Sequence, residues 1–97
     1  GLFAAVGAAG LGPGDEIIVS PYTMSASAIC ALVYGAVPIF ADIDPQTYTL
    51  DPKSIEERIT PRTKAIIVVH IFGHAADMDP IMELARKHNL VVIGDCA

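Results

Sequence analysis

The segment from Ala65 to Val69 is an unbroken apolar run, and it places the strongest constraint on the fold. A continuous run of this kind is typical of a parallel strand that is covered on both faces, here expected over residues 64–70. Similar strand patterns occupy residues 16–19, 37–41 and 90–95, and helical patterns separate them. Strands that alternate with helices are joined by right-handed crossovers. The sequence therefore predicts an α/β fold of three layers, α/β/α, around a mainly parallel sheet.

Four segments have the residue spacing or the boundary residues of helices. They cover residues 2–9, 23–34, 52–60 and 79–88. In the second of these segments, Ile29, Leu32 and Val33 form an apolar stripe that is predicted to be buried. Thr23 or Ser25 is the predicted cap of that helix. The expected boundary residues of the helices also include Gly10, Gly35, Asp51 and Asn89.

The chain is short and apolar. Its 97 residues allow one domain at most, 53% of them are hydrophobic, and the mean hydropathy is +0.51. A domain of this size buries only a little over about 60% of the surface of its unfolded chain, so a chain this apolar needs further cover. We therefore expect residues 1–97 to be a fragment of a larger protein. No apolar run is long enough for a membrane helix.

Charge and cysteine usage narrow the class of protein. The net charge of −5 is spread without runs, which argues against nucleic acid or an anionic membrane as a partner. Cys30 and Cys96 lie far apart in apolar segments and lack metal-binding spacing. Both are expected to be reduced, as in a cytoplasmic protein. The apolar start of the chain, residues 1–9, lacks the basic residues of a signal peptide.

Polar residues gather at the predicted carboxyl ends of the strands, the edge at which parallel α/β sheets bind ligands. These ends carry residues 20–24, Asp42 with Asp44, residues 70–74 and Asp95. Asp95 is the most informative, because a carboxylate at the end of a buried strand is costly to desolvate and no lysine or arginine is nearby in sequence. A cationic ligand is one expected partner, and a helix cap or a turn is the alternative role.

Two other motifs are weaker. The glycines at positions 10, 12 and 14 suggest a dinucleotide fingerprint, but they precede a strand and do not follow one, so we interpret them as a turn. A non-catalytic nucleotide- or phosphate-binding module is an alternative function. His70, His74 and Asp77 could suggest a metal site, but Gly73 and the expected loop break the helical geometry. No metal is predicted.

Several segments, taken in order, resemble one family of enzymes. They are 12–19 (GPGDEIIV), 22–26 (YTMSA), 35–45 (GAVPIFADIDP), 59–66 (ITPRTKAI), 69–73 (VHIFG), 77–79 (DMD) and 95–97 (DCA). Together they span essentially the whole chain and resemble the DegT/DnrJ/EryC1/StrS family of sugar aminotransferases, which depend on pyridoxal 5'-phosphate (PLP). The resemblance implies a fragment of the large, cofactor-binding domain of a PLP fold type I transferase. It further implies transfer of an amino group from glutamate or glutamine to a keto sugar, often nucleotide-linked, by a homodimer.

The resemblance also implies cofactor-binding residues. Asp95 matches the aspartate that pairs with the pyridine nitrogen of PLP and keeps it protonated. Met24 stands where the family commonly has an aromatic residue that packs on the cofactor ring, and a thioether packs there more weakly. Two alternatives are that Tyr22 takes this place and that Met24 is a core residue. Thr23 could donate to a cofactor oxygen, cap the helix, or do both. His70 ends a strand near the level of the cofactor and is either a cofactor contact or a structural histidine.

The chain departs from the family pattern at one position and ends before another. Gly94 stands where the family usually has Glu, so one carboxylate is lost. The Schiff-base lysine of the family is expected beyond Ala97. No catalytic residue is therefore predicted within these residues, and the chain alone is expected to be inactive. Relatives of the family include dehydratases in which that lysine is replaced, so a PLP-dependent sugar dehydratase is a second alternative.

Overall fold

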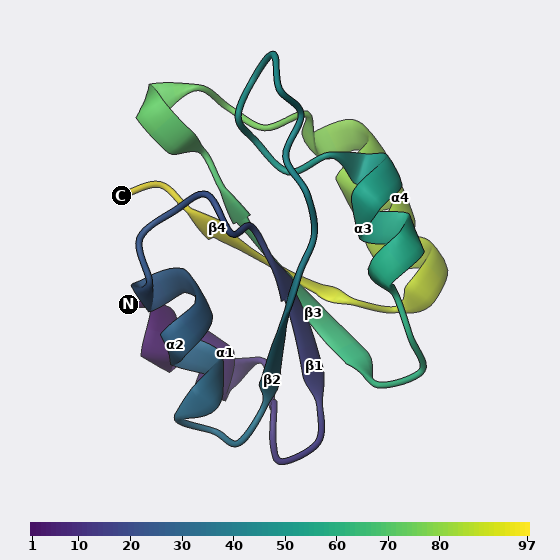
Figure 1. Cartoon of the computed structure of the whole chain (residues 1–97). Helices are drawn as coiled ribbons and strands as arrows, with labels where there is room; N and C mark the ends of the chain where they lie inside the picture. Colours follow the sequence, from purple (N-terminus) through teal and green to yellow (C-terminus); the bar gives the residue numbers. More distant parts are fainter.

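The computed structural model describes all residues from 1 to 97 and shows an α/β fold (Figure 1). The strands are β1 (Glu16–Val19), β2 (Val37–Phe40), β3 (Thr63–Val69) and β4 (Val91–Asp95). The helices are α1 (Leu2–Ala8), α2 (Ala26–Leu32), α3 (Pro52–Arg58) and α4 (Met78–His88), and a short 3-10 helix, η1, spans Ile71–Gly73. Every predicted strand and helix is present, in the predicted order.

The four strands form one parallel sheet in the order β2-β1-β3-β4. Helices α1 and α2 cover one face of this sheet, and α3 and α4 cover the other (Figure 1). The predicted three-layer arrangement is therefore confirmed. The connection from β1 to β2 runs through α2, on one face of the sheet and toward one edge. The connection from β3 to β4 runs through α4, on the other face and toward the other edge. A crevice opens at the carboxyl ends of two neighbouring strands whose connections diverge in this way.

Strand β3 contributes to the hydrophobic core on both faces of the sheet. It pairs with β1 on one side and with β4 on the other. Ala65 and Ile67 pack against α1 and α2, whereas Ile66 and Val68 pack against α3 and α4, and none of the four is exposed to solvent. Full burial of one such branched side chain contributes about 1.5–3 kcal/mol. The prediction of a strand covered on both faces is confirmed.

The buried face of α2 differs from the predicted one. Ile29, Leu32 and Val33 are 44%, 58% and 63% exposed, so the predicted stripe does not pack against the core of this chain. The helix instead buries its small residues, which are Ser27, Cys30 and Ala31.

Close packing of α2 against α1 accounts for this choice of face. The ring of Tyr34 lies directly over Gly7, where a Cβ atom would come within 2.5 Å of the phenol oxygen. The Tyr34 hydroxyl donates to the carbonyl oxygen of Phe3 at 2.8 Å. Small side chains let the two helices and the sheet approach this closely. Periodicity read from the large apolar residues cannot detect a face made of small ones.

Several predicted boundaries are confirmed. The Asp51 carboxylate accepts from the Lys53 amide at 3.0 Å and so caps α3. Asn89 ends α4 in the left-handed conformation, and Gly10 follows α1 with φ of +79°. None of the helices combines the length and the apolar character that a membrane crossing requires.

Two helix starts differ from the prediction. Helix α2 begins at Ala26, three residues later than expected, and Ser25 precedes it without a side-chain capping bond. Thr23 therefore lies in the preceding loop, where its hydroxyl has another partner. Helix α4 begins at Met78 and includes the dipeptide Asp79-Pro80, which was expected to open it. Proline is tolerated there because the first turn of a helix does not use its amide hydrogens.

The tight connection between α2 and β2 predicts a stability cost at Gly35. Its φ is +75°, and a Cβ atom there would lie 3.2–3.4 Å from atoms of Pro13. Gly35→Ala is expected to lower the free energy of unfolding by about 1–2 kcal/mol. Gly12→Ala is the matched control, because a Cβ atom at Gly12 meets nothing within 4 Å. Urea unfolding measures both variants, and equal midpoints would contradict the prediction.

Candidate functional site

A cavity of about 770 Å³ lies at the carboxyl edge of the sheet, beside the point where the connections from β1 and β3 diverge. The loop after β1, the start of α2, the loop after β3, the end of β4 and the start of α1 form its walls. The residues that line it include Thr23, Met24, Ser27, Phe72 and Asp95. This is the edge at which the sequence predicts that a ligand binds.

The Asp95 carboxylate lines this cavity and is held by two uncharged donors. Its Oδ2 atom accepts from the Ser27 hydroxyl at 3.1 Å, and its Oδ1 atom accepts from the main-chain amide of Ala97 at 3.2 Å. The residue is half-buried. A partly desolvated carboxylate whose hydrogen-bond partners are neutral keeps a strong preference for a cation. Asp95 therefore presents a negative charge to the cavity.

Thr23 extends this hydrogen-bond network. Its Oγ1 atom lies 3.3 Å from the Ser27 Oγ atom. The single hydroxyl proton of Ser27 points to Asp95, so Ser27 accepts from Thr23. A loop residue, a helix residue and a strand residue thus form one chain of hydrogen bonds that fixes the direction of the carboxylate.

Sequence reasoning missed Ser27. This residue is 1% exposed and lies on the small-residue face of α2 that the predicted apolar stripe overlooked. One signal could have found it, because Ser27 lies four residues after Thr23. Two hydroxyls at that spacing point the same way if the intervening turn is helical or nearly so.

An aromatic cluster stands next to the cavity. The rings of Tyr22, Tyr48 and Phe72 have centroids 5.7–6.4 Å apart. Phe72 lines the cavity and is 75% exposed, and Met24, which also lines it, is 78% exposed. Tyr48 and Phe72 adopt positive φ angles, a conformation that bulky residues take only where the surroundings enforce it. The sequence did not predict the cluster because its members come from three separate loops.

The structure places the His70 side chain outside the cavity. Its Nδ1 atom accepts from the main-chain amide of Ala76 at 3.0 Å, and Ala76 belongs to the core beneath α3 and α4. Its backbone neighbour Val69 packs instead against the core beneath α1 and α2. Of the four residues that the sequence singles out for cofactor binding, the cavity brings together Thr23, Met24 and Asp95 and leaves the imidazole of His70 out.

Cys30 lies behind the site. It is fully buried, and its thiol donates to the carbonyl oxygen of Ser27 at 3.3 Å. Burial raises the pKa of the Cys30 thiol above its ordinary value, and the negative charge of Asp95 acts in the same direction. The thiol therefore stays neutral near physiological pH, and it adds no second anion beside the carboxylate.

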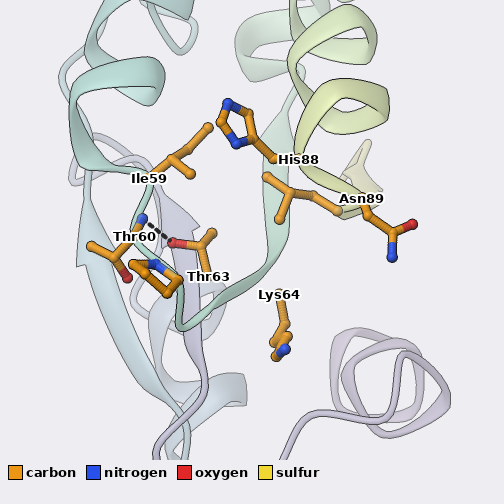
Figure 2. A pocket seen from close by; sticks show the side chains of 8 residues that line it. Ile59, Thr60, Thr63, Lys64, His88 and Asn89 are labelled. Carbon is orange, nitrogen blue, oxygen red and sulfur yellow. Dashed lines mark hydrogen bonds between the residues drawn. The ribbon is translucent and has the colours of Figure 1, made fainter.

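A separate hollow of about 390 Å³ lies near the opposite edge of the sheet, around the starts of β3 and β4 (Figure 2). Lys64 and His88 line it, and the Thr60 amide donates to the Thr63 hydroxyl at 2.9 Å.

The glycines at 10, 12 and 14 precede β1, so the interpretation as a turn is confirmed. No lysine lines the cavity at the carboxyl edge. No group of three or more histidine, cysteine, aspartate or glutamate residues is placed to hold a metal ion.

Comparison with known proteins defines the class. The model of the DegT/DnrJ/EryC1/StrS aminotransferase family matches residues 1–97. GDP-perosamine synthase of Caulobacter vibrioides is 53% identical over 96 residues, which are 99% of this chain and 26% of that protein. An aminotransferase structure from Psychrobacter cryohalolentis matches with a TM-score of 0.97 and 48% identity over 99% of this chain and 24% of that one. The structure of ntda from Bacillus subtilis with bound cofactor PMP matches with a TM-score of 0.93 and 45% identity, over 97% of this chain and 22% of that one.

These solved relatives have the fold of PLP fold type I aminotransferases, and the α/β sheet described above is part of that fold. The chain belongs to the DegT/DnrJ/EryC1/StrS aminotransferase family. The family that the sequence motifs indicate is therefore confirmed. The chain spans about a quarter of the length of the relatives it matches.

The burial of Cys30 predicts that this thiol resists alkylation. Its pKa is raised, so little thiolate is present at pH 8. Iodoacetamide at that pH is expected to leave Cys30 unlabelled in the folded protein and to label it in urea, as peptide mass spectrometry would show. The exposed Cys96 is the internal comparison. The same raised pKa makes the free energy of unfolding depend on pH. The contribution of the neutral Cys30 thiol to this free energy is complete below the ordinary pKa of a thiol, and it is lost as the pH rises through the raised pKa of the folded protein. Equal labelling of both thiols in the folded protein would contradict this assignment.

Proposed function

We propose that this chain is part of the large, cofactor-binding domain of a PLP-dependent aminotransferase. The whole enzyme transfers an amino group from glutamate or glutamine to a keto sugar, often a nucleotide-linked one. Membership of the family supports this activity, as does the 53% identity to GDP-perosamine synthase. The observation that carries the proposal is the Asp95 carboxylate, which lines a large cavity with only neutral partners.

The residues of the cavity fit a pyridine cofactor. Asp95 offers a carboxylate whose partners within residues 1–97 are all neutral, and the protonated ring nitrogen of PLP is a cation of matching charge. Met24 presents a polarisable thioether that can pack on the ring. Thr23 lies at the same wall and holds Ser27, so its role is to support the carboxylate as well as to contact the cofactor. His70 is outside this set because its imidazole does not line the cavity.

Bound PLP supplies an electron sink for the carbanion that forms when a Cα proton leaves an amino acid. The contribution of this chain is electrostatic. Asp95 holds the proton on the ring nitrogen, and Ser27 with Ala97 fixes the carboxylate so that it need not reorient during the reaction. Apolar residues in the walls, including Leu2, Val69 and Ile71, keep water away from this pair and strengthen it.

The proposal includes a homodimer in the cytoplasm. Large apolar side chains of α2 and of the edge strand β2 are exposed in this chain, which supports cover by further chain or by a second subunit. They are Ile29, Leu32, Val33, Val37 and Phe40. The net charge of −5 and the two free cysteines support a reducing compartment and small-molecule rather than nucleic-acid or membrane partners.

Asp95→Asn in the full-length protein tests the proposed function. The amide has nearly the same size but cannot hold the proton on the ring nitrogen. We expect kcat for amino transfer to fall on the order of 100-fold, as for other groups that stabilise developing charge, while the melting temperature changes little. Steady-state transfer from glutamate to a keto sugar and thermal unfolding measure the two effects. If the wild-type protein removes water from the sugar and transfers no amino group, its activity is that of the alternative, a PLP-dependent sugar dehydratase.

Asp77→Asn is the control for this experiment. Asp77 is exposed, precedes α4 and makes no side-chain capping bond, so its replacement removes the same charge at a place without a ligand. It is expected to leave kcat within about twofold of the wild-type value, as surface substitutions usually do. The proposal is wrong if both variants lose activity equally, or if Asp95→Asn loses activity only in proportion to its stability.

Met24 gives a prediction about cofactor affinity. Phenylalanine at this position offers a full aromatic face, and aromatic stacking contributes about 0.5–1.5 kcal/mol beyond buried area. Met24→Phe is therefore expected to tighten PLP binding by about two- to tenfold, and Met24→Ala is expected to weaken it. Absorbance titration of the full-length apoprotein measures both. Identical affinities in the two variants would show that Met24 does not touch the ring.

A further inference from the structure

His70 connects the loop after β3 to the strand that carries Asp95. Its main-chain amide donates to the carbonyl oxygen of Asp95 at 3.0 Å, beyond the last regular pair of β3 and β4. Its imidazole Nδ1 atom accepts from the main-chain amide of Ala76 at 3.0 Å. One residue therefore holds the end of β4 on one side and the far end of the loop on the other.

The second hydrogen bond determines the tautomer of the imidazole. An Nδ1 atom that accepts from an amide carries no proton, so the neutral ring carries its proton on Nε2. The Nε2 atom faces Gly94, where a Cβ atom would lie 3.6 Å away. Gly94 has no side chain that could contact Nε2 of His70. The hydrogen bond from Ala76 to Nδ1 is therefore formed without interference from position 94.

The loop that this bond closes forms one wall of the cavity. Ile71, Phe72 and Gly73 line the cavity, and Phe72 is held at a φ of 55°, followed by Gly73 at 71°. Glycine adopts this conformation without strain, whereas Phe72, which interrupts η1 with a non-helical backbone, takes it only where its surroundings enforce it. Within the loop, only the bond from the His74 amide to the Ile71 carbonyl oxygen braces this turn. The bond from Ala76 to His70 closes the loop around it.

We propose that His70 is a positioning residue for the site, acting through the Nδ1 atom that accepts from Ala76. Through this bond it holds Ile71 and Phe72 at the wall of the cavity, and its main-chain amide, which donates to the carbonyl oxygen of Asp95, separately anchors the end of β4. It does not touch the cofactor or the substrate. This assignment rests on the proposed function of the cavity, and of the two roles that the sequence leaves open for His70 it favours the structural histidine over the cofactor contact.

Three substitutions in the full-length enzyme separate this role from others. His70→Asn places an oxygen close to the position of Nδ1 and can still accept from Ala76, whereas His70→Phe keeps the ring shape without an acceptor. We expect His70→Phe to raise the KM for the keto sugar and the Kd for PLP about five- to tenfold, the usual effect of losing one hydrogen bond, with kcat within about twofold. His70→Asn is expected to keep both the KM and the Kd close to their wild-type values. His74→Asn, in the same loop but exposed and outside the cavity, is the matched control.

Equal constants for His70→Asn and His70→Phe would overturn the proposal, because the acceptor would then have no role. A loss confined to kcat in His70→Phe would also overturn it, since a group that acts on the reacting atoms changes kcat. A change in His74→Asn as large as that in His70→Phe would show that any histidine of the loop has the same effect, and would overturn it as well.

A measurement without turnover tests the hydrogen bond itself. Selective ¹⁵N-histidine NMR of the wild-type protein is expected to show His70 protonated on Nε2 and not on Nδ1. Hydrogen exchange of the Ala76 amide is expected to be at least about tenfold slower in the wild type and in His70→Asn than in His70→Phe. Equal exchange rates, or a proton on Nδ1, would overturn the assignment. Failure of the full-length protein to bind PLP would contradict the proposed function, and the exchange result would still decide whether His70 holds the loop.

Discussion

The burial of β3 on both faces of the sheet is the constraint on which the rest of the structure depends. Ala65 and Ile67 require one layer of helices, and Ile66 and Val68 require the other. Strand β3 also pairs on both of its edges, with β1 on one and with β4 on the other. The connections from β1 and β3 then run to opposite sides, and a crevice at their carboxyl ends follows from the topology. The position of the site is therefore a consequence of the core.

The chemistry of that crevice follows from how Asp95 is held. A carboxylate at the end of a buried strand is tolerated because Ser27 and Ala97 donate to it, and these donors orient the charge without neutralising it. No charged side chain of this chain neutralises it, and this is the observation behind the proposed pairing with a pyridine cofactor. The raised pKa of Cys30 has the same physical origin, since the buried surroundings of the site disfavour an uncompensated anion.

Prediction from sequence succeeded where one local pattern determines the outcome. The apolar run of β3 and the caps at Asp51 and Asn89 depend on neighbouring residues only, and each was found where expected. It failed on α2, whose buried face consists of small residues that pack closely against α1. For the same reason Ser27 was missed although its partner Asp95 was identified. The sequence left two roles open for His70, because its place at a strand end does not reveal to which face the ring turns.

The sequence by itself determined the order of the elements, the parallel sheet, the family and the place of Asp95 at the carboxyl edge of the sheet, because these depend on periodicity, strand ends and motifs that are local in the chain. Only the tertiary structure decided which side chains share the cavity. Ser27 and Asp95 are 68 residues apart in sequence, and the rings of Tyr22, Tyr48 and Phe72 come from separate loops. Such contacts form when helices pack on the sheet, and a pattern that is read along the chain carries no information about the distance between segments that fold together.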